Sequence, residues 1–350
     1  MKIGILTFHY CNNFGAALQA YALKSVLADM GEDVFFVQHY IEEILPHQKQ
    51  IKEILNDDNT IINKLRTLFF YLRHYHITKQ HLNRFNSFRN KYFNERPVLS
   101  NQDADLLIIG SDQVWNTKIT GQIDKYYWGE FGHRLNIKQI SYAASCPSDT
   151  IVPEMKSYLS YFDAIGVREN SLKEKIFNVF RIESTCNLDP TLLLSKSEWE
   201  KIIGNERIVK ENYIFEYNIS DTQKLLEIGP AIEKKLKLTR IGLSSTHLLQ
   251  KAGPLEFLNL IKNAQISLVS SFHGAVFSVI FHKTFLFFPK GDSTDERVEN
   301  LLTKLGLQQN ICYNETNDIQ FPKVDWELVE QKLDSLRKDS INYLTANIYS

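Results

Sequence analysis

The chain has 350 residues, of which 43% are hydrophobic and 23% are charged. This composition is typical of a folded protein with enough apolar material for about two domains, and it excludes a largely disordered chain. Lys and Arg total 40 and Asp and Glu total 41, so the net charge is close to zero. We therefore expect no nucleic-acid partner and no strongly acidic partner.

The cysteines and the apolar runs bear on cellular location. No cysteine is spaced from another as zinc ligands are, and a chain of this length does not need disulfides; the cysteines are Cys11, Cys146, Cys186 and Cys312. The apolar run after Lys2 is too short for a signal peptide, and no stretch is long enough to span a membrane. These features predict reduced thiols, no metal site and a cytoplasmic protein.

Strand and helix patterns alternate along the first half of the chain. The apolar pattern of residues 14–31 predicts a helix that ends at Gly31. Short buried runs predict strands at 2–8, 33–38, 104–110, 138–145 and 162–167. Buried strands separated by helices indicate a parallel, doubly wound sheet.

The same alternation begins again after "LDPTLLL" (188–194). Helices are predicted at 222–236, 253–264, 274–281 and 295–306, and strands at 213–217, 239–243, 266–270 and 284–289. Pro254 stands at the first position of its helix, where a missing N–H costs nothing. The sequence therefore predicts an α/β protein with two doubly wound, Rossmann-like lobes, residues 1–190 and 191–350, with a C-terminal helix and a cleft between the lobes.

Residues 60–94 interrupt this alternation with a basic segment that lacks Asp and Glu. Apolar residues recur in it at helical spacing, among them Ile61, Leu65 and Leu72. A basic amphipathic helix is typical of a segment that lies on an anionic membrane surface. The alternative is an ordinary helical pair that packs its apolar stripe on the first lobe.

The stretch "LVSSFHGAVFSVIF" (268–281) places a histidine inside an apolar run, between a predicted strand and a predicted helix. The start of a helix after a parallel strand favours anions, since its N–H groups and dipole point there. His273 is therefore a candidate anion ligand or proton donor, with Ser271 and Gly274 beside it. The alternative is a histidine that is hydrogen-bonded inside the lobe.

Three further charged residues follow buried strands or begin helices. Asp112 in "IIGSDQVWN" follows a strand, and its alternative role is to cap a helix. Arg168 in "IGVRENS" presents a fork suited to carboxylate or phosphate, or forms an ion pair with Glu169. Arg297 stands early in a helix, where the dipole disfavours a cation; it either meets an anion there or lies on the surface.

The first turn, "FHYCNNFGAAL" (8–18), has one Gly and lacks the G-x-G-x-x-G pattern of dinucleotide-binding proteins. Three of its residues are candidates for lining the cleft and forming hydrogen bonds to a sugar: Asn12, Asn13 and Gly15. The chain contains no phosphate-binding P-loop, H-E-x-x-H or G-x-S-x-G motif.

Taken in order, these stretches resemble the polysaccharide pyruvyl transferase family. The resemblance covers about residues 3–306 and rests on "NFGAALQAYAL", "GSDQVWN", "SYAAS", "VRENSL", "LDPTLL", "GPLEFLNLIKNA", "SSFHGAVFSVIF" and "RVENLL". It implies a two-lobed fold like that of GT-B glycosyltransferases. It also implies transfer of the pyruvyl group of phosphoenolpyruvate to a sugar, usually as a cyclic ketal, with release of phosphate and without a cofactor.

By position, the resemblance implies that His273, Arg168 and Arg297 bind phosphoenolpyruvate and that Asp112 belongs to the same site. His273 and Asp112 then act as acid and base, in an order that the sequence does not assign. The second lobe would be the donor side and the first the acceptor side. Many members carry Arg two places before this histidine, where the chain has Ser271.

The acceptor implied is a sugar of a surface polysaccharide, or of a glycan precursor on a polyprenyl diphosphate carrier. A lipid-linked acceptor would give the basic segment a purpose, because it would hold the enzyme on the inner membrane face. Two alternatives stay open. One is a GT-B glycosyltransferase that uses a nucleotide-sugar, with Glu256 as the carboxylate that holds the ribose. The other is a non-catalytic, membrane-attached family member, for which Ser271 is the best support.

Overall fold

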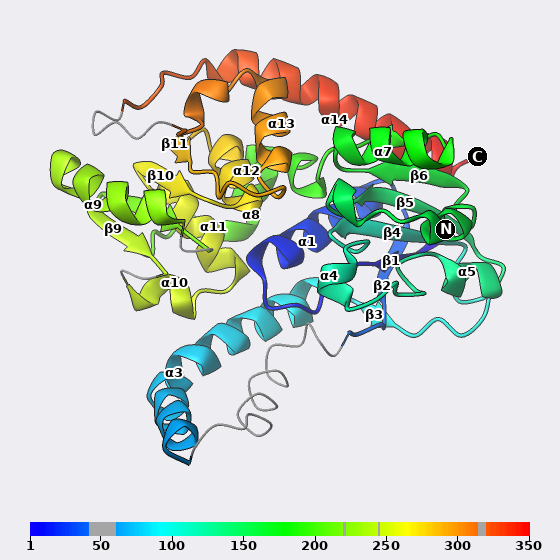
Figure 1. The fold of residues 1–350 in the computed structure, drawn as a ribbon, viewed down its shortest axis with the longest axis horizontal. Coiled ribbons are helices and arrows are strands. Elements are labelled where there is room, and N and C mark those ends of the chain that lie inside the picture. Colours follow the sequence, from blue (N-terminus) through cyan, green and yellow to red (C-terminus); the bar gives the residue numbers. More distant parts are fainter. Residues whose placement is uncertain (42–60, 220–221, 244–245, 314–319) are drawn as a thin grey trace. The chain divides into compact units, whose positions relative to one another are not determined.

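A computed structural model describes residues 1–41, 61–219, 222–243, 246–313 and 320–350, and of residues 61–74 it describes the backbone alone. They form two compact units (Figure 1). Unit 1 comprises Met1–Leu193 with Ser340–Ser350, and unit 2 comprises Leu194–Asp339. The sequence placed this boundary at 190/191 and assigned residues 340–350 to the second lobe, whereas the structure divides the chain at 193/194 and returns those last residues to unit 1.

Unit 1 is built on a seven-stranded sheet in the order β3-β2-β1-β4-β5-β6-β7, and all its strand pairs are parallel. The strands are β1 (Lys2–Leu6), β2 (Asp33–Val37), β3 (Glu95–Arg96), β4 (Leu106–Asp112), β5 (Lys138–Ala144), β6 (Ala164–Val167) and β7 (Thr185–Cys186). The central strands are buried almost throughout, which explains their continuous apolar runs.

The helices of unit 1 are seen in Figure 1. They are α1 (Phe14–Asp29), α3 (Ile61–Tyr92), α4 (Thr117–Thr120), α5 (Glu130–Arg134), α6 (Lys156–Leu159) and α7 (Asn170–Phe180). The side chain of Asn13 caps α1 by accepting a hydrogen bond from the backbone N of Ala16 at 3.1 Å. Gly31, with φ of +92°, follows the end of the helix, as the sequence predicted.

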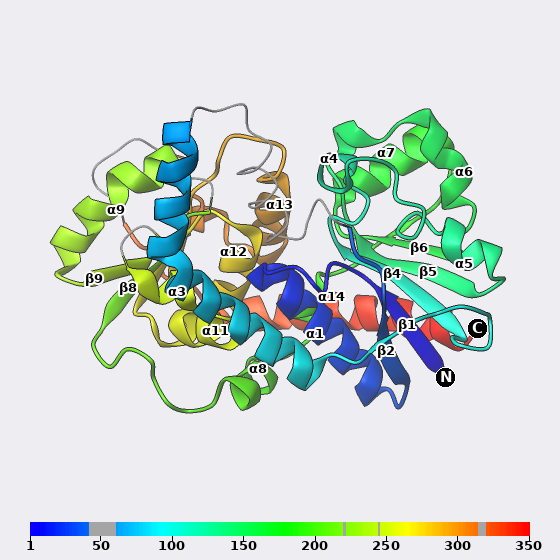
Figure 2. The same ribbon diagram turned by 90° about the horizontal axis from the view of Figure 1, so that it is seen from below.

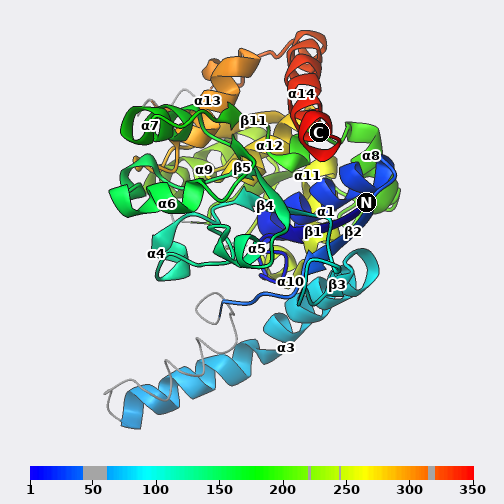
Figure 3. The ribbon, with the colours of Figure 1, turned by 90° about the vertical axis from the view of Figure 1, so that its right-hand side faces the viewer.

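The predicted basic segment is one helix, α3, of 32 residues rather than a helical pair. Its C-terminal part packs on α1, where the Phe85 ring lies 5.4 Å from that of Phe14 and the Phe88 ring 5.9 Å from that of Tyr21. Its N-terminal end points away from the sheet of unit 1 (Figure 3). The side chains of Ile61, Leu65 and Leu72, on which the membrane hypothesis depends, lie outside the described residues.

Unit 2 is built on a smaller parallel sheet in the order β11-β10-β8-β9. Its strands are β8 (Tyr213–Tyr217), β9 (Thr239–Gly242), β10 (Ile266–Val269) and β11 (Thr284–Phe287). Its helices are α8 (Lys196–Ile203), α9 (Gln223–Leu236), α10 (His247–Lys251), α11 (Pro254–Asn263), α12 (Phe272–Ile280) and α13 (Glu296–Leu305). Pro254 occupies the first position of α11, as predicted.

The last helix, α14 (Trp326–Ile348), begins in unit 2 and ends in unit 1. In unit 1, Ser340 Oγ accepts a hydrogen bond from Leu188 N at 2.9 Å, and Tyr343 OH donates to Ser141 O at 2.8 Å. These buried bonds explain why residues 340–350 belong to unit 1. The chain termini lie side by side at the edge of this unit (Figure 2), and Glu32 contacts both Met1 N and Tyr349 OH.

The predicted α/β class, with two doubly wound units, is confirmed. Each unit has its own core. In unit 1, the rings of Trp115 and Trp128 stack at 5.0 Å, and in unit 2 the ring of Trp199 meets that of Phe277 at 5.1 Å. How the units face each other stays a prediction. Among the described helices, none is sufficiently long and apolar to cross a membrane.

Candidate functional site

The connectivity of unit 2 identifies one edge of its sheet as a binding position. The chain leaves β8 for β9 and then returns to the other side of β8 as β10. In open α/β sheets, ligands bind outside the carboxyl ends of the two strands where the strand order reverses in this way. At this edge, Ser270 Oγ donates a hydrogen bond to Asn218 Oδ1 at 3.0 Å and ties the two strand ends together.

The segment after β10 starts helix α12. Ser271 is its N-cap, and its hydroxyl accepts a hydrogen bond from Gly274 N at 3.1 Å. The helix begins at Phe272, two residues before the predicted start, so His273 lies in the first turn rather than between strand and helix. The His273 side chain is partly exposed and stands at the positive end of the helix dipole. This is the position where an anion is favoured.

The glycine at position 274 has a packing explanation. A Cβ added there would lie 2.9 Å from Ser271 Oγ and 3.0 Å from Val269 Cβ, so a larger residue would force its neighbours to shift. The residue therefore lets α12 start directly against β10. Its predicted contact with phosphoenolpyruvate stays a prediction.

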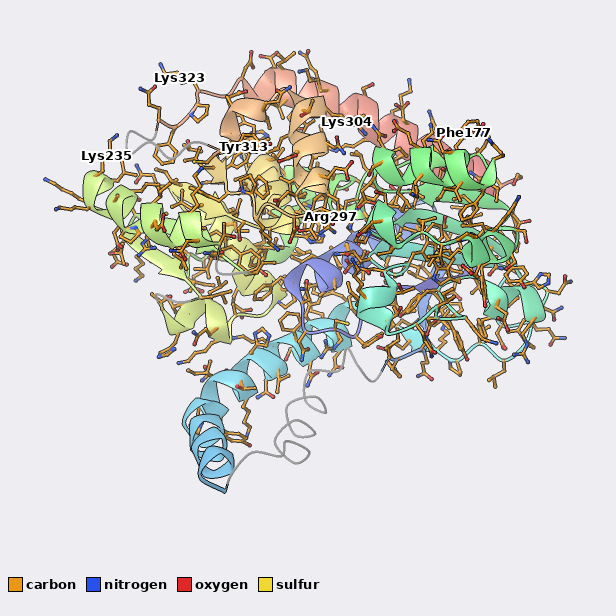
Figure 4. The ribbon with its side chains drawn as sticks, viewed as in Figure 1. Phe177, Lys235, Arg297, Lys304, Tyr313 and Lys323 are labelled. Atoms are coloured by element: carbon orange, nitrogen blue, oxygen red, sulfur yellow. The ribbon has the colours of Figure 1, made fainter. Side chains whose placement is uncertain are left out.

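Arg297 brings a cation to the start of α12. It is the second residue of α13 (Figure 4), and its guanidinium lies over the ring of Phe272, 5.8 Å from the ring centre. Its Nε donates a hydrogen bond to Thr294 O at 3.3 Å, and the side chain is partly exposed. A cation in a first turn is opposed by the dipole of its own helix. An anion bound between Arg297 and His273 would remove that penalty.

A separate pocket of about 460 Å³ opens in unit 2 beside the end of β11. Its lining contains neither His273 nor Arg297, and four of its residues are acidic and two are lysines. The acidic residues are Asp292, Asp295, Glu296 and Glu299. Such a lining repels a polyanion, so we do not assign phosphoenolpyruvate to this pocket.

Glu256, the carboxylate considered for a nucleotide-sugar donor, has a structural role. Its Oε2 accepts a hydrogen bond from Gly253 N at 2.9 Å at the start of α11. This contact is half of a helix capping box, in which an acidic residue satisfies a backbone N–H of the first turn. Helix capping therefore explains the presence of Glu256 at this position without a bound ribose.

Unit 1 has its own reversal of strand order, between β1 and β4. Thr7 Oγ1, after β1, donates to Ser111 O at 2.9 Å, and Asp112 ends β4. Ser111 and Asp112 have φ of +44° and +74°, which non-glycine residues rarely adopt. Backbone strain of this kind clusters at functional sites, because only a fixed surrounding structure maintains it. The Asp112 carboxylate accepts from Gln113 N at 2.8 Å and is partly exposed.

The acceptor candidates follow β1. Asn13 caps α1, and Asn12 Oδ1 accepts a hydrogen bond from Arg89 Nη1 at 3.0 Å. The same nitrogen donates to Tyr10 O at 3.0 Å, so Arg89 fixes the loop that holds both asparagines. Gly15 is buried in the first turn of α1. The sequence identified Arg89 only as one of the basic residues of the 60–94 segment and missed this role.

Arg168 lies in a buried ion-pair network rather than at an open strand end. Its three donor nitrogens bond to Glu169 at 3.1 Å, Asp189 at 2.8 Å and Ser145 Oγ at 2.9 Å. Its side chain is 3% exposed. Burial alone would lower the pKa of Arg168, but Glu169 and Asp189 outweigh it and raise the pKa. The structure therefore shows the structural ion pair that the sequence left as the alternative; contact with phosphoenolpyruvate stays a prediction.

Some solved structures of sugar-nucleotide enzymes are similar to this chain at low identity. A putative UDP-N-acetylglucosamine 2-epimerase from Listeria monocytogenes is 10% identical with a TM-score of 0.49, over 97% of this chain and 88% of that one. The UDP-GlcNAc 2-epimerase from Methanocaldococcus jannaschii is 11% identical with a TM-score of 0.46, over 95% and 92%. The Escherichia coli ADP-heptose heptosyltransferase II is 8% identical with a TM-score of 0.37, over 97% and 99%. These values are too low to bear on function.

A comparison with family models is more informative. No curated protein matches the chain. The family model described as polysaccharide pyruvyl transferase matches residues 13–289, well over half of the chain, and includes His273 and Asp112. The chain therefore belongs to the polysaccharide pyruvyl transferase family and is a transferase.

Proposed function

We propose that this protein transfers the pyruvyl group of phosphoenolpyruvate to a sugar of a surface-polysaccharide or lipid-linked glycan precursor. The product is a pyruvate ketal and the second product is phosphate. The observation that carries the proposal is the Arg297 guanidinium over Phe272, beside the first turn of α12 that holds His273. Family membership supplies the reaction class, and this arrangement supplies a place for a small anion.

The donor carries a carboxylate and a phosphate, so its site needs positive potential at two points. The first turn of α12 offers backbone N–H groups and the dipole of a nine-residue helix. Arg297 offers a planar fork that suits either anionic group. Ser271 stands where many family members carry Arg, and we propose that Arg297 supplies the charge that Ser271 lacks.

The reaction requires one proton at the methylene carbon of phosphoenolpyruvate and the loss of one proton from each of two sugar hydroxyls. Protonation gives an oxocarbenium-like carbon, and the first hydroxyl forms a C–O bond to it. The second hydroxyl then forms its C–O bond as the bond to phosphate breaks. In the overall balance, one hydroxyl proton ends on the new methyl group and the other on phosphate. No cofactor is needed, and we propose that none is used.

His273 and Asp112 are the proposed acid and base of this sequence. We assign His273, at the anion-favouring helix start, to proton donation or to the phosphate. Asp112 would accept a proton or bind the acceptor. Its partly exposed carboxylate ends β4 at the reversal of strand order, near Asn12 and Asn13 of the acceptor loop in the topology of unit 1.

A nucleotide-sugar transferase is the alternative function. It needs a carboxylate for the donor ribose, and the capping contact of Glu256 weakens the candidate in unit 2. A non-catalytic family member is the other alternative. The hydroxyl of Ser271 caps α12. A serine at this position is therefore explained by helix capping and does not by itself indicate a loss of activity.

We also propose that α3 holds the enzyme on the cytoplasmic face of an anionic membrane, where a polyprenyl-linked acceptor would lie. The helix is continuous over 32 residues, and its residues Lys79 and Lys91 are exposed. The measurement is co-sedimentation with vesicles of anionic and of neutral lipids. Binding to anionic vesicles that falls with salt supports the proposal, and equal recovery from both kinds of vesicle contradicts it.

Phosphate release tests the main proposal. The purified protein is incubated with phosphoenolpyruvate and with galactose, glucose, mannose and their N-acetylamino forms, supplied either as methyl glycosides or as polyprenyl diphosphate sugars. Phosphate that appears only with an acceptor supports the pyruvyl transfer. In a parallel incubation, a sugar nucleotide replaces phosphoenolpyruvate. Release of a nucleoside diphosphate there supports the glycosyltransferase. Silence with every donor supports the non-catalytic alternative.

A further inference from the structure

A histidine and an aspartate that are distant in sequence meet at the strand ends of unit 1. His39 follows β2, and Asp124 lies in the connection between β4 and β5. His39 Nε2 lies 3.0 Å and 3.1 Å from the two carboxylate oxygens of Asp124. A carboxylate only accepts hydrogen bonds, so the proton of the neutral imidazole is on Nε2, and Nδ1 carries a lone pair.

The protein fixes both partners. The Asp124 carboxylate accepts hydrogen bonds from the backbone N of Tyr126 at 2.9 Å and of Tyr127 at 3.1 Å. The His39 ring stacks on the Tyr126 ring at 4.0 Å and meets the Tyr127 ring edge-on at 5.2 Å. Burial raises the pKa of Asp124, but the hydrogen bonds from His39 and from these amides outweigh burial and hold the pKa below its usual range. The carboxylate is therefore ionised at neutral pH.

The second nitrogen of the imidazole, Nδ1, is left for a ligand. The His39 side chain is 15% exposed, and within the described part of the chain no group forms a hydrogen bond with Nδ1. An imidazole with one nitrogen held by a carboxylate and the other turned to solvent has the arrangement of a general base.

The pair belongs to the same cluster of strand ends as the proposed acceptor loop. Tyr10, in that loop, accepts a hydrogen bond from Ile41 N at 2.9 Å, two residues after His39. Tyr127 OH donates to Thr7 O at 3.4 Å, at the end of β1. These contacts join the ends of β1 and β2 to the segment that carries Asp124. β1 is one of the two strands at the reversal of strand order in unit 1.

We propose that His39 is a general base for a hydroxyl of the acceptor sugar and that Asp124 is its positioning residue. The inference rests on the proposed pyruvyl transfer. As the hydroxyl oxygen forms its C–O bond to the pyruvyl carbon, its O–H bond breaks and the proton passes to Nδ1. Asp124 stabilises the imidazolium, which then releases its proton to water. The departing phosphate takes up a proton from water.

The test compares two variants with wild type in the phosphate-release assay, with the panel acceptor that wild type uses fastest. His39→Gln keeps an N–H near Asp124 and removes the basic nitrogen. We expect kcat to fall about 100-fold or more, because general base catalysis contributes about 10²–10⁴-fold, while phosphoenolpyruvate binding is unchanged. The control is His133→Gln, which removes another histidine of unit 1 stacked on a tyrosine, at 4.3 Å from the Tyr161 ring. It should retain wild-type kcat within about twofold.

Two further readouts separate catalysis from structure. Added imidazole should restore His39→Gly by about tenfold or more, which a merely structural histidine would not allow. Nitrogen NMR of histidine-labelled protein should show His39 protonated on Nε2 at neutral pH, and Asp124→Asn should mix the two tautomers.

Two results overturn the role of His39 while the pyruvyl transfer stands. The first is that wild type is active and His39→Gln keeps a third or more of its kcat. The second is that NMR shows the neutral ring of His39 protonated on Nδ1 in wild type. Wild type that releases no phosphate with any acceptor overturns the pyruvyl transfer and this role together.

Discussion

The two units place polar residues at the carboxyl ends of their strands by different means. In unit 1, the backbone itself is strained there: Gly110, Ser111, Asp112 and Ala143 all have positive φ. In unit 2, the segment from Ser270 to Gly274 has ordinary φ and leads into a well-capped helix. Where its strand order reverses, unit 2 therefore presents an unstrained helix start after β10, whereas the end of β4 in unit 1 carries its polar residues on strained backbone.

The two predicted anion-binding arginines differ in the same way. Arg168 of unit 1 is buried among Glu169, Asp189 and Ser145. Arg297 of unit 2 is partly exposed, donates a hydrogen bond to Thr294 O and lies over the ring of Phe272. The two arginines thus lie in different surroundings, and the buried carboxylates around Arg168 explain its structural role.

Removal of His273 should give the largest effect. His273→Ala removes a group that donates a proton or holds phosphate, so we expect kcat to fall about 10²–10⁴-fold. The helix should persist, because Ser271 still caps it. The control is His247→Ala, which removes an exposed histidine of the same unit and should leave kcat near wild type. Equal rates for the two variants would remove His273 from the site.

The next largest effect separates the arginines by stability. Arg168→Ala leaves Glu169 and Asp189 buried without their cation and should cost about 3–5 kcal/mol of unfolding free energy, measured in urea. Arg297→Ala, a partly exposed position, should cost about 0.5 kcal/mol or less. If Arg168→Ala unfolds like wild type and loses only phosphoenolpyruvate binding, the original sequence prediction is right and the structural assignment is wrong.

The strained end of β4 gives a third prediction. Gly110 has φ of +129°, and an added Cβ would lie 2.6 Å from Tyr142 O. Gly110→Ala should therefore cost about 3 kcal/mol of stability. Gly121 also has positive φ, +74°, but nothing lies within 4 Å of its Cβ position. Gly121→Ala should cost only about 1 kcal/mol; similar losses in urea unfolding for both variants would show that β4 yields to the added methyl group.

The smallest effect is a pH dependence from Asp124. Its folded pKa lies below the unfolded value, so its stabilisation is complete above about pH 4 and is lost as the pH falls through the folded pKa. The difference in unfolding free energy between wild type and Asp124→Asn should shrink below about pH 4. A difference that stays constant from neutral to acidic pH would mean that His39 and the amides of Tyr126 and Tyr127 do not stabilise the ionised carboxylate.

The sequence predicted the main strands and helices well because each carries a local signal. Pro254 marks the start of α11, and the buried runs of β1, β4 and β5 stand out from their neighbours. β3 and β7 were missed because two residues show no period. The start of α12 was placed at Gly274 instead of Phe272 because Ser271 was not recognised as the N-cap.

The site was less predictable because its contacts join distant residues. Arg168 meets Asp189, which is 21 residues away, and His39 meets Asp124, which is 85 residues away. A signal for His39 did exist: it stands two residues after a buried strand, like the other candidates. No signal for Asp124 existed in the sequence, because a carboxylate in a long connection has no defined neighbours until the connection folds.

Binding of phosphoenolpyruvate to unit 2 is the central claim, and titration calorimetry tests it most directly. Wild type should bind phosphoenolpyruvate, and Arg297→Ala should bind it at least about tenfold more weakly, since a charged hydrogen bond contributes about 1.5–3 kcal/mol. Arg207→Ala, at an exposed arginine of the same unit, should bind like wild type. Unchanged affinity in Arg297→Ala, or no binding to wild type, would contradict the account.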